Sequence, residues 1–448
     1  MGTRTKLLMA AMGWACATNA AAEDLMEIYR AAQQNDAVLA SARATWTATQ
    51  ERLPQARAGL LPNVNANAAT NYNMVRNEVR TQPPIVGSDR FFTFGGTISA
   101  SQPIFRLQNV VVYREAGQQV VQADYVLASA QQDLILRVAQ AYFDVLLAQF
   151  TVELTETQKS AVSEQLAQAR RNFEVGVATI TDTNEAQARF DTITAQEIAA
   201  RNDLDNKITA LRVIIGRAPG ELKRLGAGFE PALPEPNNPD YWADRALKDN
   251  YAVRIAQANR DIAALEVERA RAAHMPTVDL VASWNQAGAT GAVSSGGSVT
   301  SADTRSRTAI LGLQFAVPIY QGGAIQSRVR EAMALEERSR QDLETNRRNA
   351  LFLAQTGFAG VTSAAASIKA FEQALVSAQT AYESNRLGLE VGVRTTLDVL
   401  NVQQNVYQTR RDLAQAYFNY IVGMLRLKAA AGTLSDTDLE EMNRRLAG

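Results

Sequence analysis

The stretch Glu-Val-Gly-Val-Ala-Thr at residues 174–179 returns as Glu-Val-Gly-Val-Arg-Thr at residues 390–395. A second landmark repeats at nearly the same distance, since Pro-Ile-Phe at residues 103–105 corresponds to Pro-Ile-Tyr at residues 318–320. The offset between matching landmarks stays between 214 and 216. The chain is therefore one unit of roughly 200 residues written twice, a period too long for a solenoid. This duplication predicts two structurally equivalent halves.

The N-terminus has the pattern of a secretory signal peptide. A positively charged start and an apolar run occupy residues 4–17, and Ala20-Ala21-Ala22 supplies small residues for cleavage. We therefore expect residues 1–22 to be removed on export. The one cysteine, Cys16, lies in this segment, which leaves the mature chain without a thiol for a disulfide or a metal site. A lipid-anchored Cys16 is the competing interpretation, but Trp14 stands where such a signal has small or aliphatic residues.

The composition is that of a helical protein without a strong charge bias. The formal net charge of −1 gives no electrostatic reason to expect nucleic acid as a partner. No segment after the signal peptide is expected to reach the roughly 20 apolar residues that a membrane helix needs. Any membrane role is therefore expected to come from strands.

Each repeat has the pattern helix, strand, strand, helix, helix. For the first repeat, residues 23–216, the pattern predicts helices at 25–59, 108–175 and 180–215 and strands at 62–78 and 91–105. For the second repeat, residues 241–432, it predicts helices at 240–273, 323–391 and 395–431 and strands at 276–287 and 305–320. Pro54 is expected to kink or break the first helix. The Pro-rich residues 217–240 and the C-terminal residues 433–448 are expected to pack as equatorial segments outside the bundle.

The predicted strands alternate between apolar and polar residues, as outer-membrane barrel strands do. Val64, Ala66 and Ala68 alternate with asparagines, and a Gly/Ser/Thr-rich loop at about 287–303 separates the second pair of strands. Ordinary soluble hairpins are the alternative. Four membrane strands cannot close, because the smallest barrels have about eight and an open edge in lipid leaves backbone groups unsatisfied. Several chains must then share one barrel.

The long helices exceed the size of a globular domain. A helix of about 65 residues is on the order of 100 Å long. Such helices make sense when they pack side by side as coiled coils, and Leu343, Ala350 and Leu353 fit a seam of this kind.

The mature chain resembles the TolC family of outer-membrane channel-tunnels along its whole length, and most strongly after Ala381. The resemblance rests on residues 381–383 (Ala-Tyr-Glu), 391–400 (Val-Gly-Val-Arg-Thr-Thr-Leu-Asp-Val-Leu) and 431–439 (Ala-Gly-Thr-Leu-Ser-Asp-Thr-Asp-Leu) and on Tyr420. It implies a mainly α fold with a membrane β-barrel: a homotrimer with four strands per chain, a twelve-stranded barrel and a periplasmic coiled-coil tunnel. It also implies a Gram-negative outer membrane, a periplasmic adaptor and an inner-membrane transporter of the ABC or RND type.

The same resemblance implies a gate at the repeated segment. Arg394 matches an arginine that ties one helix pair to its neighbours, and Thr181 and Asp182 match the residues to which it is tied. Such a charge-assisted contact is sensitive to salt when it is partly exposed. Asp398 matches the first of two acidic rings at the narrowest point of the pore, where carboxylates attract cations. The turns are expected to dock the adaptor or transporter through Val175, Gly176, Val177, Val391, Gly392 and Val393.

Two positions depart from the family pattern. Asn401 stands where the second acidic ring is expected, and Leu389 stands where a tyrosine helps to hold the closed state. We therefore expect weaker binding of polyvalent cations and a less tightly held gate. In a simpler interpretation, Gly176 and Gly392 only end helices, and the aspartates only favour the first turn of the next helix.

The leading function is a passive export duct for proteins, peptides or small toxic compounds. One histidine and no mature cysteine remove most catalytic constellations, so we expect no enzyme, cofactor or metal site. A periplasmic coiled-coil adaptor or structural protein is the main alternative, and a secreted hydrolase is the weaker one.

Overall fold

The computed structural model describes residues 22–79, 85–177, 179–226, 229–295, 298–301, 303–444 and 446. The chain forms two compact units, and each takes segments from both sequence repeats. The tip unit comprises Met1–Ala40, Ala130–Ala243 and Leu353–Gly448, and the strand unit comprises Ser41–Ser129 and Asp244–Phe352. The repeats therefore do not fold as separate lobes, because equivalent elements of the two halves belong to the same unit.

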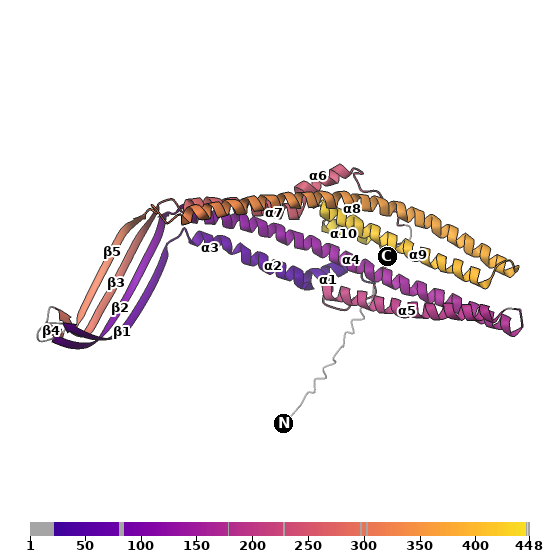
Figure 1. Cartoon of the computed structure of the whole chain (residues 1–448), viewed down its shortest axis with the longest axis horizontal. Coiled ribbons are helices and arrows are strands. Elements are labelled where there is room, and N and C mark those ends of the chain that lie inside the picture. The colour runs from indigo at the N-terminus through magenta and orange to yellow at the C-terminus, as the bar shows by residue number, and fades with distance from the viewer. Residues whose placement is uncertain are drawn as a thin grey trace, which may run out of the picture. The chain divides into compact units, whose positions relative to one another are not determined.

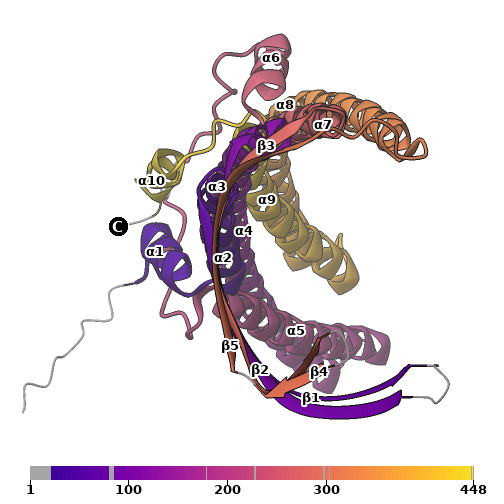
Figure 2. The same ribbon diagram turned by 90° about the vertical axis from the view of Figure 1, so that its left-hand side faces the viewer.

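The strand unit holds one antiparallel sheet with four long strands in the order β1, β2, β3, β5 (Figure 1). The long strands are β1 Asn63–Val79, β2 Ile85–Phe105, β3 Thr277–Ser295 and β5 Thr304–Ala316. A short β4, Ser298–Ser301, pairs only with the end of β3. The strands of the first repeat thus join those of the second through the β2–β3 pair. In Figure 2 the long strands curve along their length.

The strands differ from the predicted ones mainly at their loop ends. Strand β2 begins at Ile85 instead of 91, and β3 continues to Ser295 instead of 287. Most of the predicted flexible loop at 287–303 is therefore strand, because backbone pairing between strands extends the ladder where side chains alone give a weak signal. Strand β5 ends at Ala316, two residues before Pro318, which cannot donate to a ladder. Pro83 and Pro84, between the first two predicted strands, lie outside the described residues.

The predicted helix at 25–59 is three helices: α1 Leu25–Asn35, α2 Ala37–Gln50 and α3 Arg52–Ala58. The first break falls at Asp36, which has an extended backbone and accepts a hydrogen bond from the Leu39 amide at 2.7 Å. The second break falls at Glu51, so that Pro54 lies in the first turn of α3, where no backbone donor is needed. Pro54 therefore sits just inside a helix start, three residues after the break.

The corresponding helix of the second repeat is also broken. The predicted helix at 240–273 is α6 Pro239–Asp249 and α7 Tyr251–Ala272. Asn250 separates them and accepts hydrogen bonds from the amides of Ala252 and Val253. Asp36 and Asn250 thus cap equivalent helices in the two repeats.

A buried ion pair fixes the Asp36 break within the tip unit. Both terminal nitrogens of Arg137 contact the Asp36 carboxylate, at 2.8 and 3.0 Å. The Asp36 side chain is 4% exposed, and hydrogen bonding from Arg137 lowers the pKa of its carboxyl. Asp36 therefore stays charged and bridges a helix break to a long helix.

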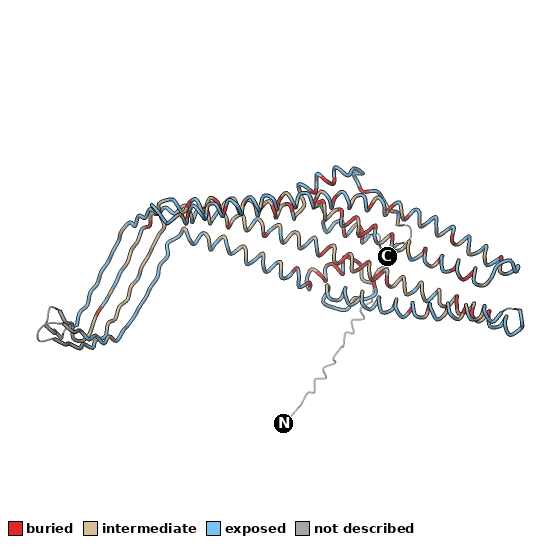
Figure 3. The backbone as a smooth tube through the Cα atoms, viewed as in Figure 1, coloured by how far each residue is buried: buried red, intermediate tan, exposed pale blue. Residues whose placement is uncertain are grey.

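The long helices have nearly the predicted bounds. They are α4 Leu107–Glu174, α5 Ile180–Ile215, α8 Ala324–Glu390 and α9 Thr396–Ala430, and the short α10 covers Asp436–Arg444. Among the described residues, the largest fully buried side chains all lie in the tip unit, for example Tyr142, Phe143, Leu211, Ile215, Tyr420 and Ile421 (Figure 3). The bulkiest part of the core is therefore in this unit, and the strand unit also buries apolar residues such as Val111, Val253 and Leu343.

The connector and the C-terminal segment both pack against this core. Leu222 is buried and forms a parallel bridge with Glu23, and Leu225 pairs with Leu446. The buried Tyr142 donates a hydrogen bond to the carbonyl of Lys223 at 2.8 Å.

Within the described residues, two of the long helices, α4 and α8, are long and apolar enough to cross a membrane by length and composition. The expectation that no segment after the signal peptide comes close to this is therefore wrong. Runs of alanine and other small apolar residues raise the hydropathy of these helices without making them bulky, and a core helix of a soluble protein can have the same composition.

Candidate gate at the helix turns

The α4–α5 and α8–α9 turns end their first helix in the same way. Gly176 and Gly392 both have φ near +77°, the left-handed conformation that glycine adopts without strain. Each glycine amide bonds the carbonyl three residues back, and the next valine amide bonds the carbonyl five residues back, at 2.9 Å for Val177 and 2.8 Å for Val393. This hydrogen-bond pattern is a Schellman motif.

The helix that follows each turn begins with a capping box. Thr179 accepts from the Asp182 amide, and the Asp182 carboxylate accepts from Thr179. Thr395 and Asp398 repeat these contacts, with 3.0 Å between the Thr395 nitrogen and Asp398 Oδ2. The simpler interpretation, in which these glycines end helices and these aspartates stabilise the start of the next helix, is therefore supported by contacts that are present in the structure. Their roles in gating stay predictions.

The two turns border a groove of about 730 Å³ within the tip unit. Its lining includes Val177, Asp182, Leu389, Gly392 and Arg394. The structure thus brings five predicted gate or turn residues to one groove. Within the described part of the chain, no hydrogen bond or ion pair joins Arg394 to Thr181 or Asp182, so the predicted tie is not made inside this chain.

Arg394 is held close to α8 by a glycine that the sequence analysis missed. The Arg394 amide bonds the Gly388 carbonyl at 3.1 Å. A methyl group added at Gly388 would lie 2.7 Å from Arg394 Cγ, so only glycine leaves room for this side chain. The first repeat has Asn172 and Ala178 at the equivalent positions, so the glycine and the arginine differ between the repeats together.

Asp398 keeps its charge. Hydrogen bonds from the backbone and side chain of Thr395 lower the pKa of its carboxyl, and the positive charge of Arg394 acts in the same direction. A carboxylate held in this way remains ionised in neutral solution, as a charged ring in a pore requires.

Asn401 has a partner that the sequence did not indicate. Its Oδ1 accepts a hydrogen bond from Arg189 Nη2 at 2.8 Å, and Arg189 Nη1 also bonds Gln404. These contacts join α5 to α9 in the tip unit. An arginine on the exposed face of a predicted helix gives no signal of its own, which is why Arg189 was missed.

An apolar cluster adds to this α5–α9 contact. Val162 of α4, Ile193 of α5 and Leu400 of α9 are buried together, and Phe190 packs against them. The α9 helix is therefore anchored one residue before Asn401.

Buried polar atoms without partners lie close to the groove. Gln165 and Gln403 line it, and the Oε1 atom of each is buried without a hydrogen bond, as is Thr183 Oγ1. A buried acceptor that lacks a hydrogen bond costs free energy, so a donor that reached one of these atoms would lower the free energy of the protein.

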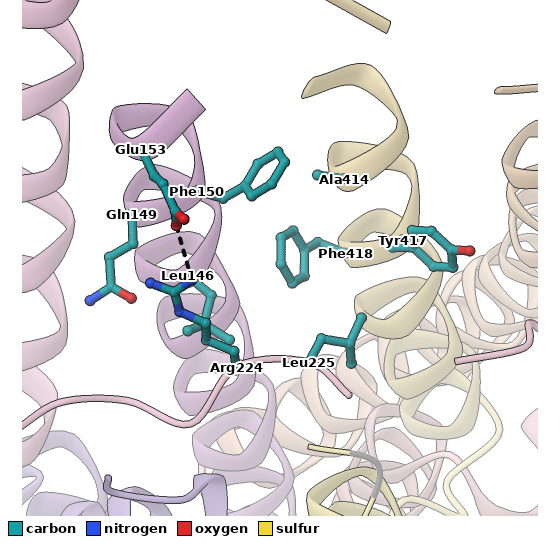
Figure 4. A pocket seen from close by; sticks show the side chains of 9 residues that line it. All are labelled: Leu146, Gln149, Phe150, Glu153, Arg224, Leu225, Ala414, Tyr417 and Phe418. Atoms are coloured by element: carbon teal, nitrogen blue, oxygen red, sulfur yellow. Dashed lines mark hydrogen bonds and ion pairs between the residues drawn. The ribbon is translucent and has the colours of Figure 1, made fainter. Parts of the chain in front are cut away.

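A smaller apolar pocket lies where the connector crosses α4 and α9. It has a volume of about 210 Å³, and Phe150, Phe418 and Leu225 line it (Figure 4). Arg224 of the connector forms an ion pair with Glu153 of α4 at 2.9 Å. Leu225 and this ion pair hold the connector to the two helices.

A sheet with an apolar and a polar face, in a chain whose long helical hairpins end in capped turns, defines the class of outer-membrane channel proteins. The chain belongs to the outer membrane efflux protein family, whose model matches residues 28–217 and 242–433. The two matched segments follow the two repeats. The predicted family and the outer-membrane location with a periplasmic tunnel are confirmed, and the protein is an outer-membrane efflux channel.

Its relatives include channels and secretion proteins. The chain is 32% identical to "Outer membrane protein TolC" of Vibrio cholerae over 425 residues, which cover 95% of this chain and 94% of that protein. It is 33% identical to "Alkaline protease secretion protein AprF" of Pseudomonas aeruginosa over 421 residues, 93% of this chain and 86% of that protein. The fold matches the Campylobacter jejuni CmeC outer membrane channel with a TM-score of 0.77 at 17% identity, over 95% and 90% of the two chains.

Proposed function

We propose that this chain forms the passive exit duct of a tripartite export system that moves proteins or peptides across the outer membrane. The single observation that carries this proposal is the sheet of four long strands with two open edges, β1 and β5. Open edges in lipid must be paired, so strands of further copies complete the barrel. Three copies supply twelve strands, in line with the family resemblance.

We infer that protein substrates are the main cargo. The support is the similarity to a relative named for alkaline protease secretion, at 33% identity over most of both chains. Small toxic compounds are the second candidate cargo, supported by the efflux name of the family.

We infer that the turns dock the other two components, a periplasmic adaptor and an inner-membrane transporter of the ABC or RND type. Four valines of the turns are strongly exposed: Val175 (72%), Val177 (75%), Val391 (67%) and Val393 (74%). The glycines at 176 and 392 shape these turns. Exposed apolar residues of this kind suit a partner that presents apolar side chains.

We infer that the gate combines contacts within the chain and contacts between copies. Arg189 ties α5 to α9 within the chain through Asn401. Arg394 is left for Thr181 and Asp182 of a neighbouring copy, and Asp398 supplies the charged ring. Leu389 has no polar group that could help to hold the closed state as a tyrosine would. The hydrogen bond from Arg189 to Asn401 therefore replaces part of that restraint.

Deletion of the gene from its host tests this function. The culture medium should lose one or more secreted proteins, and the full-length gene should restore them, while the protein itself fractionates with the outer membrane. Loss of resistance to toxic compounds with an unchanged set of secreted proteins would favour small molecules as cargo. Recovery of the protein as a soluble periplasmic monomer would contradict the duct and favour an adaptor.

A further inference from the structure

The sheet of the strand unit has one apolar and one polar face, and the strand register assigns residues to each. Directly paired residues share a face. One row across β1, β2, β3 and β5 is Val64, Ala100, Ala282 and Leu311. The next row, on the other face, is Asn65, Ser99, Ser283 and Ile310, three of which are polar. The first face is therefore the lipid face, and the amide- and hydroxyl-rich second face lines the lumen.

The apolar stretch on this lipid face has the height of a membrane. On β1 it runs from Val64 to Met74 at alternate positions. At roughly 3.3 Å per residue and a tilt of about 40°, this run spans about 25 Å, the height of the apolar band of an outer-membrane barrel. Near its end, the rings of Tyr72 and Phe92 are 4.8 Å apart, as expected for an aromatic girdle.

Arginines follow where this apolar stretch ends. On β1 the next lipid-face residue after Met74 is Arg76, and on β2 the next after Phe92 is Arg90. On β5 the apolar residues Phe315, Leu313, Leu311 and Ala309 are followed on the same face by Arg307 and Arg305. By the register, Arg307 lies in the row of Ala68 and Arg305 in the row of Thr70, so these two lie within the apolar stretch of β1. Arg90 and Arg76 lie one and two rows beyond the Tyr72–Phe92 pair, and we call these two residues the arginine belt.

The belt lies at the outer end of the strands. Helix α3 ends at Ala58 just before β1, and α4 begins at Leu107 just after β2, so the helices join the opposite ends of these strands. Arg76 and Arg90 are both exposed. Among the described residues, no side chain forms an ion pair or a hydrogen bond with either arginine. Exposed cations beyond an aromatic girdle on the lipid face are placed at the headgroups of the outer leaflet.

We propose that the arginine belt binds the phosphate groups of lipid A in the outer leaflet. The guanidinium fork matches phosphate oxygens bidentately, and its charge is attracted to an anionic membrane surface. The cargo is not the ligand, because the belt shares its face with Leu311, Leu313 and Phe315 and not with the lumen residues. The belt would therefore fix the height of the barrel in the membrane and recruit a shell of phosphorylated lipid.

Native mass spectrometry of the full mature protein in neutral detergent tests this proposal. The protein is titrated with bis-phosphorylated lipid A, with the same lipid after dephosphorylation, and with inorganic phosphate as a competitor. The test variant is Arg76→Gln/Arg90→Gln. The matched control is Arg330→Gln/Arg347→Gln, which removes two exposed arginines of α8. Arg76→Lys/Arg90→Lys keeps the charge and serves where the glutamine variant fails to assemble.

We expect lipid A to bind about 30-fold more weakly to the glutamine variant, the loss for two neutralised arginines near an anionic surface. The α8 control should bind like the wild type, the lysine variant should lose affinity only in part, and the dephosphorylated lipid should bind weakly to all. Equal affinity of wild type and glutamine variant, or equal binding of the dephosphorylated lipid, would overturn the proposal. Complete displacement of lipid A by millimolar phosphate would overturn it too, since the belt would then be a site for free anions.

Discussion

At the residue scale, Asp398 and Asp182 have the same capping contacts but different proposed roles. Each carboxylate accepts from the threonine three residues before it. Both alanine variants should lose a helix cap worth about 1 kcal/mol. Only Asp398→Ala should reduce the cation selectivity of the reconstituted channel, measured as the reversal potential in a salt gradient. An unchanged reversal potential in Asp398→Ala would show that Asp398 does not form a charged ring in the pore.

The Arg189 contact is a residue-scale test of the gate. Arg189→Ala removes hydrogen bonds to Asn401 and Gln404 and should make opening easier by about 1 kcal/mol per chain. For a trimer this sums to about 3 kcal/mol, so the ratio of open to closed channels should rise on the order of 100-fold, which single-channel recordings measure as a higher open probability. Arg201→Ala is the matched control, because Arg201 bonds Glu156 and Glu197 inside the α4–α5 hairpin and does not contact α9. Equal open probabilities in the two variants would show that the Arg189 contact is not part of the gate.

The Asp36–Arg137 pair gives a pH dependence. Asp36→Asn leaves Arg137 without its buried partner and should cost about 3 kcal/mol of stability. In the wild type the pKa of Asp36 is lower in the folded state than in the unfolded chain. The Asp36 carboxylate therefore contributes its full stabilisation when the pH is above the pKa that Asp36 has in the unfolded chain. This stabilisation is lost as the pH falls through the pKa of Asp36 in the folded state, which lies below 3.8.

Thermal melts of both proteins between pH 7 and pH 3 check this prediction. The stability difference between wild type and Asp36→Asn should shrink at the acid end. A constant difference over this range would contradict the assigned pairing.

At the element scale, Gly176 and Gly392 are required because the turns need a left-handed backbone conformation, and not because a larger side chain would clash. An alanine Cβ at Gly176 or Gly392 would meet nothing within 4 Å, but φ is +77° at both. Gly176→Ala and Gly392→Ala should each cost about 1 kcal/mol or slightly more. Gly360→Ala, in the interior of α8 and equally free of neighbours, should stabilise by about 0.5 to 1 kcal/mol. Chemical denaturation checks the signs, and a neutral Gly392→Ala would contradict the assigned left-handed turn.

Elements with local signals were predictable from the sequence. Helix α5 has its predicted bounds because Thr179 caps its start and Gly216, with φ +73°, ends it. The break at Asp36 was not predicted, because it depends on Arg137, which is distant in sequence. The extension of β3 to Ser295 was missed because its Gly and Ala residues have low strand propensity and its end is held by pairing with β4.

The residues of the candidate site also fall into those with a signal in the sequence and those defined only by contacts in space. The turn residues were found because they repeat, and the structure brings Asp182, Leu389 and Arg394 to one groove. Gly388 and Arg189 were missed because their roles arise from contacts in space, with Arg394 and with Asn401. The proposed tie between Arg394 and Asp182 lies between copies and cannot be read from a single chain.

At the scale of the whole molecule, the open edges β1 and β5 require further copies of the chain in lipid. Native mass spectrometry of the protein extracted from the outer membrane tests whether several chains share one barrel. We expect one species with three times the mass of the mature chain. A single-chain mass under the same mild conditions would contradict the shared barrel and the duct with it.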